Sequence, residues 1–60
     1  MSLLDLKAEM VRNRIKQRQV AARLELSEGR LSDILLGVKP VDADMVRRIR
    51  EAIEVLKIQH

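Results

Sequence analysis

The sequence predicts an all-α domain of four helices. Glycine and proline interrupt the chain at only three positions, Gly29, Gly37 and Pro40. No segment alternates apolar and polar residues with the period of two that a half-buried strand requires. Sixty residues allow one small core, so residues 1–60 are expected to form a single domain.

The first expected helix runs from Ser2 to about Asn13. Ser2 with Asp5 three residues later resembles a capping box, and Asn13 is a suitable left-handed residue to end the helix. Its inward stripe consists of apolar residues at helical spacing, namely Leu3, Leu6 and Met10, with Leu4 and Val11 as candidates to widen it.

The second and third expected helices are short. The second spans about Lys16 to Leu24, and its start is weakly signalled because Lys16 stands where a Ser or Thr cap is usual. The third begins after Ser27, a favourable N-cap, and stops at Gly37. The residues expected to point inward are Val20, Ala21 and Leu24 from the second helix and Leu31, Ile34 and Leu35 from the third.

The fourth expected helix, about 43–58, begins after Asp42, a favourable N-cap residue, and the negative charge of Asp44 suits the positive end of the helix. Its broad apolar face comprises Val46, Ile49, Ile53 and Leu56, widened by Met45, Ala52 and Val55. Two interpretations stay open. Either this is a closing helix buried in its own core, or its end meets a partner chain through Ile53, Leu56 and Ile58.

The composition excludes several kinds of site. Without cysteine there are no disulfides or thiolate ligands, and the single histidine, His60, cannot build a metal site. Without aromatic residues there is no stacking platform for single-stranded nucleic acid. We expect no cofactor, metal or small-molecule ligand. Since neither a metal nor a disulfide stabilises the small core, we expect a homodimer.

Positive charge gathers in one part of the chain. The net charge is +3, and five basic residues without an acidic one lie between positions 12 and 23, namely Arg12, Arg14, Lys16, Arg18 and Arg23. This block is either a phosphate-facing patch or an ordinary solvated surface. No apolar run reaches the length of a membrane span, and the start MSLLDLKAEM lacks the basic region of a signal peptide, so a cytoplasmic protein is expected.

The segment QRQVAARLELSEGRLSDILLG, residues 17–37, resembles the helix-turn-helix of the phage-repressor-like (XRE-type) DNA-binding domains. The positions that match the family pattern are Gln17, Ala21, Leu24, Leu26, Ser27, Leu31, Ile34 and Gly37. The resemblance implies a lambda-repressor-like fold with the motif at about 17–36. Many members have a fifth helix, for which sixty residues leave little room, and the long fourth helix is expected to take its place.

The chain departs from the family at two positions. The family usually has glycine at the turn, where this chain has Glu25, and glycine before the apolar residue that precedes the second helix, where it has Arg14. A left-handed residue other than glycine costs roughly 1 kcal/mol. The turn at Glu25 is therefore expected to be either mildly strained or reshaped.

The resemblance assigns DNA contacts to two sets of residues. The early, outward residues of the third helix would read base edges in the major groove, namely Glu28, Gly29, Arg30, Ser32 and Asp33. Contacts to the DNA backbone would come from Gln17, Arg18, Ser27, Lys39 and Arg47. Each has an ordinary alternative. Glu28 can simply favour the helix N-terminus, and Gly29 can be a tolerated first-turn glycine.

The function expected from this resemblance is sequence-specific binding of double-stranded DNA. A small dimeric repressor acting by occupancy of a palindromic operator is the simplest form. The alternative is a protein-interaction module that keeps the fold with little DNA affinity, because Glu28 and Asp33 would repel phosphates. An enzyme is not expected, since the chain has no nucleophile–histidine pair and no glycine-rich phosphate loop.

Overall fold

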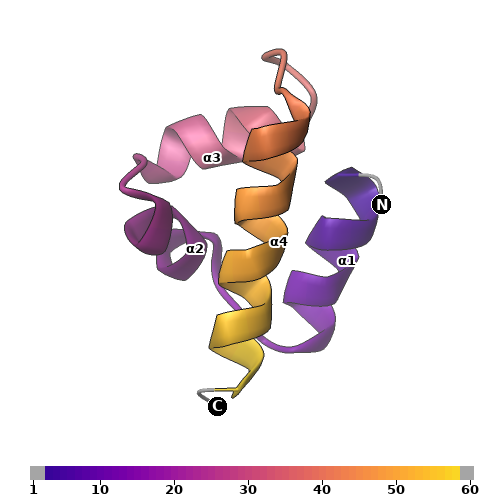
Figure 1. The fold of residues 1–60 in the computed structure, drawn as a ribbon, viewed down its shortest axis with the longest axis vertical. Helices are drawn as coiled ribbons and strands as arrows, with labels where there is room; N and C mark the ends of the chain where they lie inside the picture. The colour runs from indigo at the N-terminus through magenta and orange to yellow at the C-terminus, as the bar shows by residue number, and fades with distance from the viewer. Residues whose placement is uncertain (1–2, 59–60) are drawn as a thin grey trace.

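Four helices make up the part of the chain that the computed structural model describes, residues 3–58, and this part contains no strand. They are α1 (Leu3–Arg12), α2 (Gln17–Leu24), α3 (Glu28–Leu35) and α4 (Ala43–Ile58). α4 runs through the middle, with α1 on one side and α2 and α3 on the other (Figure 1). The all-α prediction is confirmed. The expected Ser2 cap and His60 lie outside the described residues.

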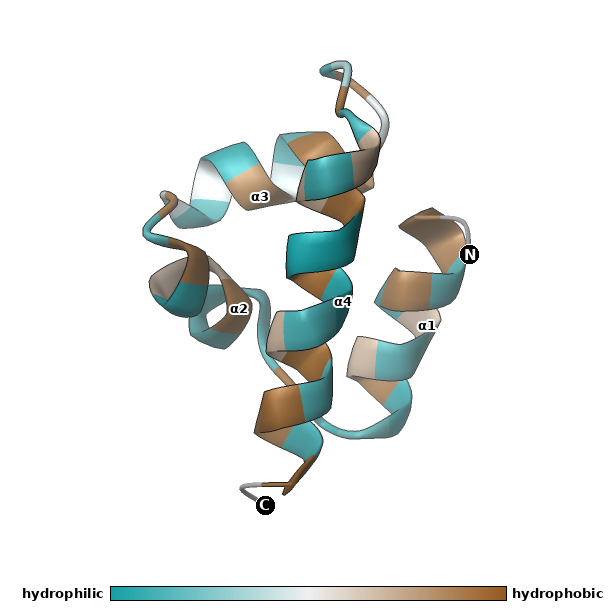
Figure 2. Cartoon of the chain, in the orientation of Figure 1, coloured by the Kyte–Doolittle hydropathy of each residue, from teal (hydrophilic) through white to brown (hydrophobic). Residues whose placement is uncertain are grey.

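The core is aliphatic throughout. Its buried side chains are Leu6, Met10, Ile15, Val20, Ala21, Leu31, Ile34, Leu35, Ile49, Ala52, Ile53 and Leu56. Within residues 3–58 no polar or charged side chain is buried. Figure 2 shows brown apolar segments alternating with teal polar ones along each helix, as expected of helices with one buried side. Most predicted inward residues are buried and so confirmed, while five are only half-buried, namely Leu3, Leu24, Met45, Val46 and Val55.

The prediction that Leu4 and Val11 widen the inward stripe of α1 is wrong. These side chains are 74% and 73% exposed, because they lie on the opposite face of the helix from the buried Leu6 and Met10. Ile15, in the link between α1 and α2, is buried in the core and was not predicted there.

Three helices end in the same hydrogen-bonded turn. A left-handed residue follows each of these helices: Arg14 (φ 57°) after α1, Glu25 (φ 58°) after α2 and Gly37 (φ 78°) after α3. After each left-handed residue, the next N–H bonds a carbonyl five residues back, as Ile15 does to Met10 at 2.8 Å. This is the Schellman pattern. The expectation that Asn13 is the left-handed residue is therefore wrong, because the reversal falls one residue later, at Arg14, and the Ile15 that follows it is buried in the core.

Side-chain caps define the helix starts. Ser27 Oγ accepts the Arg30 N–H at 3.1 Å, and Asp42 Oδ1 accepts the Met45 N–H at 2.8 Å, so both predicted caps are confirmed. For α2, Gln19 Oε1 accepts the Lys16 N–H at 2.8 Å. This is half of a capping box, and it supplies the start signal that Lys16 itself lacks.

Candidate nucleic-acid interface

α3 presents one face to the core and the other to solvent. Its buried residues are Leu31, Ile34 and Leu35. All five residues predicted to read bases lie on the remaining surface, with Glu28, Gly29 and Arg30 exposed and Ser32 and Asp33 half-buried. α2 precedes α3 across only three residues, 25–27, and the two helices pack against each other. This pairing fixes the direction in which the outer face of α3 points.

The first turn of α3 offers hydrogen-bond donors. Ser27 is exposed, and its oxygen is occupied as an acceptor by the Arg30 N–H, which leaves its hydroxyl proton free to donate to an anion. The first turn also carries the partial positive charge of the helix dipole. Glu28 opposes that charge in the same turn. Ser27 therefore both caps the helix and offers a donor at its N-terminus.

No packing contact in residues 3–58 requires glycine at position 29. Gly29 is helical, and a Cβ added to it would meet no atom within 4 Å. Glycine in a helix costs up to about 1 kcal/mol relative to alanine. The domain thus keeps a bare backbone on an exposed helix face without any packing reason of its own.

Arg30 and Lys39 line one hollow beside α3. The hollow has a volume of about 350 Å³ and lies between α3, the following loop and the start of α4. Its other lining residues are Ile34, Pro40, Val41, Asp42 and Met45. Arg30 and Lys39 are exposed, and neither forms an ion pair with any residue in 3–58. The structure thus brings a predicted base contact and a predicted backbone contact to the same rim.

The other predicted backbone contacts differ in their surroundings. Arg18 is exposed in the first turn of α2 without an ion pair in the described chain, and Gln17 beside it is half-buried. Arg47 instead contacts two carboxylates, Asp44 at 2.5 Å and Glu51 at 2.6 Å. Hydrogen bonds to Asp44 and then Glu51 raise the pKa of Arg47. A phosphate would have to compete with both carboxylates for this guanidinium.

Oppositely charged residues four apart on a helix can pair, and this spacing predicts the pairs Arg47–Glu51 and Arg50–Glu54 on α4. The expected Arg47–Glu51 pair is present. The Arg50–Glu54 pair is absent from the described residues, because Glu54 contacts Lys57 at 3.2 Å instead. Lys57 also reaches Glu9 of α1 at 2.6 Å. Sequence reasoning missed this last contact, which joins residues 48 positions apart.

The predicted partner contacts at the end of α4 are corrected. Ile53 and Leu56 are buried at 1% and 9% exposure, because the seam of α4 closes the core of its own chain. They offer almost no side-chain surface to a second chain. Of the three residues, only Ile58 is exposed.

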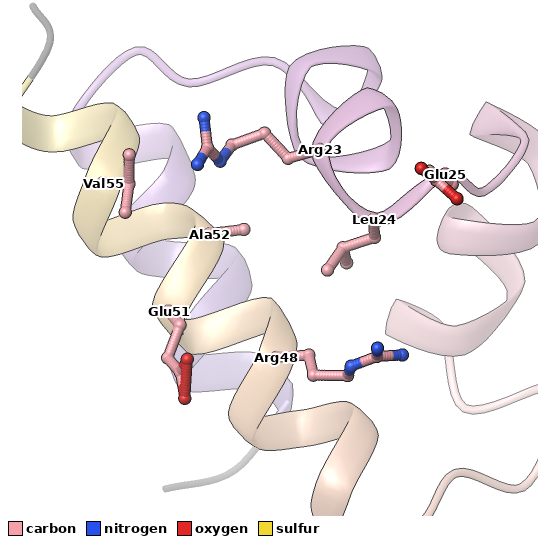
Figure 3. Close-up of a pocket in the computed structure, with 7 residues that line it drawn as sticks. All are labelled: Arg23, Leu24, Glu25, Arg48, Glu51, Ala52 and Val55. Carbon is pink, nitrogen blue, oxygen red and sulfur yellow. The ribbon is translucent and has the colours of Figure 1, made fainter.

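A second hollow of about 410 Å³ lies between the end of α2 and α4 (Figure 3). Figure 3 shows Arg23 and Arg48 at its two ends, with Leu24 and Ala52 between them. Glu25, Glu51 and Val55 complete the lining. Two arginines and two glutamates balance in charge, and no predicted DNA contact lines this hollow. It therefore adds nothing to a phosphate-binding surface.

No helix in residues 3–58 is long and apolar enough to cross a membrane. The same residues contain no group of three or more acidic or histidine side chains placed to hold a metal ion. Comparison of the chain with models of protein families, with curated proteins and with solved structures found no match.

Proposed function

We propose that the chain is a sequence-specific double-stranded DNA-binding regulator with a lambda-repressor-like helix-turn-helix. It would act as a homodimer that represses by occupying a palindromic operator. The observation that carries the proposal is the outer face of α3. There an exposed Arg30, a glycine with open space around it and a capped helix N-terminus lie together, with Lys39 on the same rim.

Affinity and specificity would come from different residues. Arg18 and Lys39 are exposed cations without carboxylate partners in residues 3–58, so a phosphate meets no internal competitor there. Arg30 can donate two hydrogen bonds to a guanine edge. Glu28 and Asp33 repel phosphates but can accept from the amino group of cytosine. The acidic residues then select among bases and do not contribute to the overall affinity.

The test is selection of duplexes from a random pool by the purified chain, followed by titration across a salt series. We expect enrichment of a short site with two symmetric halves, and an affinity that falls by orders of magnitude between low and moderate salt. A scrambled duplex of equal length is the control. Absence of duplex binding at low salt would contradict the proposal.

The second candidate is a protein-interaction module. The observation that favours it is the exposure of Leu36 and Val38, at 62% and 67%, directly after α3. A protein partner would bury these apolar side chains, whereas a phosphate backbone would not. Loss of a partner with Leu36→Ser, in a chain that binds no duplex, would support this candidate over DNA binding.

A further inference from the structure

The outer face of α1 carries an apolar stripe that no residue in 3–58 covers. Leu4, Ala8 and Val11 follow one another at spacings of four and three, which places them in one line along the helix. All three are exposed, and together with Lys7 and Arg12 they line a shallow depression. α1 meets the rest of the domain through its other side, where Leu6 and Met10 are buried. The domain thus has two apolar faces on one short helix and uses only one of them.

The stripe has the form of a two-fold interface. A larger aliphatic side chain stands at each end and the small Ala8 stands between them. If two copies of α1 pack antiparallel, Leu4 of each copy meets Val11 of the other, and the two Ala8 residues face each other at the axis. Small residues at the crossing allow the helices to approach to about 8 Å. The same surface then serves both copies, as in any two-fold dimer.

Charges beside the stripe favour the antiparallel orientation. Asp5 and Arg12 are seven residues apart, two turns of helix, and so they flank the stripe on the same side near its opposite ends. When two copies of α1 pack antiparallel, the flank with Asp5 and Arg12 lies against the same flank of the other copy, running in the opposite direction. Asp5 of each copy then lies opposite Arg12 of the other. Arg12 contacts Glu9 at 3.3 Å and is 72% exposed, which leaves it further N–H donors. Parallel packing would separate these opposite charges.

Lys7 works against the pairing. It lies on the other flank near the middle of the stripe, where it approaches Lys7 of the second copy. The single repulsion between the two Lys7 side chains opposes the two attractions between Asp5 and Arg12. In addition, a single face of a ten-residue helix is smaller than the roughly 800 Å² per partner of a standard interface. The resulting dimer is weak and strongly dependent on concentration.

We infer that the outer face of α1 binds a second copy of this chain, with α1 pairing antiparallel to α1 through Leu4, Ala8 and Val11. The inference takes from the proposed function only the expectation of a homodimer, and it names the surface. This surface takes the place of the end of α4 as the expected dimer contact, because two of the three residues expected there are buried in the core. It stands or falls without reference to DNA.

Disulfide trapping tests the arrangement, because the chain contains no cysteine of its own. Ala8→Cys is expected to form a disulfide-linked dimer under mild oxidation at least ten-fold faster than Ala22→Cys, an exposed alanine of α2. Leu4→Cys and Val11→Cys are expected to cross-link when mixed but slowly when alone. Equal rates for Ala8→Cys and Ala22→Cys would overturn the inference. Fast self-linking of Leu4→Cys would indicate parallel pairing and overturn the antiparallel arrangement.

Sedimentation over a concentration series tests the same face without cross-links. The unmodified chain is expected to dimerise, and Ala8→Glu to weaken dimerisation at least ten-fold, while Ala22→Glu leaves it unchanged. Helical circular dichroism checks that each variant is folded. A chain that stays monomeric up to millimolar concentration, or one that Ile58→Glu disrupts and Ala8→Glu does not, contradicts the inference.

The two proposals fail in different experiments. If Ala8→Glu is a monomer that still binds one half of a selected duplex, DNA binding stands and the dimer surface is supported. If the chain dimerises through α1 but binds no duplex, the dimer surface stands and the proposed function falls.

Discussion

The cations of α4 and those on and beside α3 differ in whether a carboxylate already contacts them. On α4, Arg47 contacts Asp44 and Glu51, and Lys57 contacts Glu54 and Glu9. On α3 and its flanks, Arg30 and Lys39 have no ion-pair partner in residues 3–58. Arg47 and Lys57 of α4 therefore act within the domain, whereas Arg30 and Lys39 remain available to a molecule outside it. Substitutions in the two groups are therefore expected to separate effects on folding from effects on binding.

The largest expected effect is that of Arg30→Ala on binding to the preferred duplex. Loss of a bidentate base contact removes about 1–3 kcal/mol, or roughly ten- to a hundred-fold in affinity. Because the base contact is specific, affinity for random DNA is expected to fall much less. Fluorescence anisotropy with both duplexes measures this. Equal losses on the two duplexes would show that Arg30 contacts only the backbone.

Gly29→Ala is expected to affect folding and binding in opposite directions. The added methyl group meets nothing in the domain and improves helix propensity, so the free energy of unfolding should rise by up to about 1 kcal/mol. A duplex close to the helix backbone would be pushed away by the methyl, and we expect about a ten-fold loss of affinity. Urea unfolding and anisotropy measure the two effects. A variant that gains stability and binds unchanged would show that Gly29 is only tolerated.

Lys39→Ala and Arg47→Ala test the comparison directly, because each removes one cation, an unpaired one beside α3 and a paired one on α4. Lys39→Ala is expected to weaken binding to all duplexes several-fold and to reduce the slope of affinity against salt by about one. Arg47→Ala is expected to change affinity less than about two-fold, because two carboxylates already hold its guanidinium. The salt series measures both slopes. A larger effect from Arg47 would show that phosphate displaces the carboxylates, and the contrast between α3 and α4 would fail.

Glu25→Gly tests a charged residue that neither forms an ion pair in residues 3–58 nor belongs to the expected DNA contacts. Glu25 is left-handed like Gly37 but carries a side chain that this conformation disfavours by roughly 1 kcal/mol. The variant is therefore expected to gain up to about 1 kcal/mol in free energy of unfolding, with unchanged duplex binding. Gly37→Ala is the converse control and should lose a similar amount. If Glu25→Gly gains nothing, the turn is not strained.

Features that depend on neighbouring residues were predicted well from the sequence. Features that depend on contacts between distant parts of the chain were not. Ser27 and Asp42 marked helix starts because a cap involves only neighbouring residues. Leu4 and Val11 were misplaced because α1 is apolar on two faces, and only packing decides which face turns inward. Burial of Ile53 likewise depends on where α4 crosses the other helices.

The candidate site was predictable in the same respect: local helix geometry could be predicted from the sequence, and contacts between side chains could not. Helical spacing alone placed the expected base-reading residues on the unburied side of α3. It could not indicate which cations are already neutralised, since Arg47 and Lys39 look equally available in the sequence. Nor could it reveal the contact between Lys57 and Glu9, which only the packing of α1 beside α4 creates.

That last contact gives the smallest and most selective expected effect, a dependence of stability on pH. The hydrogen bond from Lys57 lowers the pKa of Glu9 below its ordinary value of 4.5, and the same bond raises the pKa of Lys57. A carboxyl whose pKa falls on folding stabilises the fold above its unfolded pKa and loses that contribution as pH falls through its folded pKa. The unmodified chain should therefore lose an advantage over Glu9→Gln as pH falls below about 4.5. The raised pKa of Lys57 acts at the other end, where its contribution is lost as pH rises above its ordinary value of 10.5.

Urea unfolding of both chains at a series of pH values from 7 to 3 measures this advantage. Glu54→Gln is the matched control, because Glu54 also contacts Lys57 but is more exposed and lies on the same helix. The difference in free energy of unfolding between the unmodified chain and Glu54→Gln should change less over the pH series than the difference for Glu9→Gln. Parallel stability curves for the unmodified chain and Glu9→Gln would show that the pair adds nothing to folding. Lys57 would then be as available as the cations around α3, and the contrast between the two helices would rest on Arg47 alone.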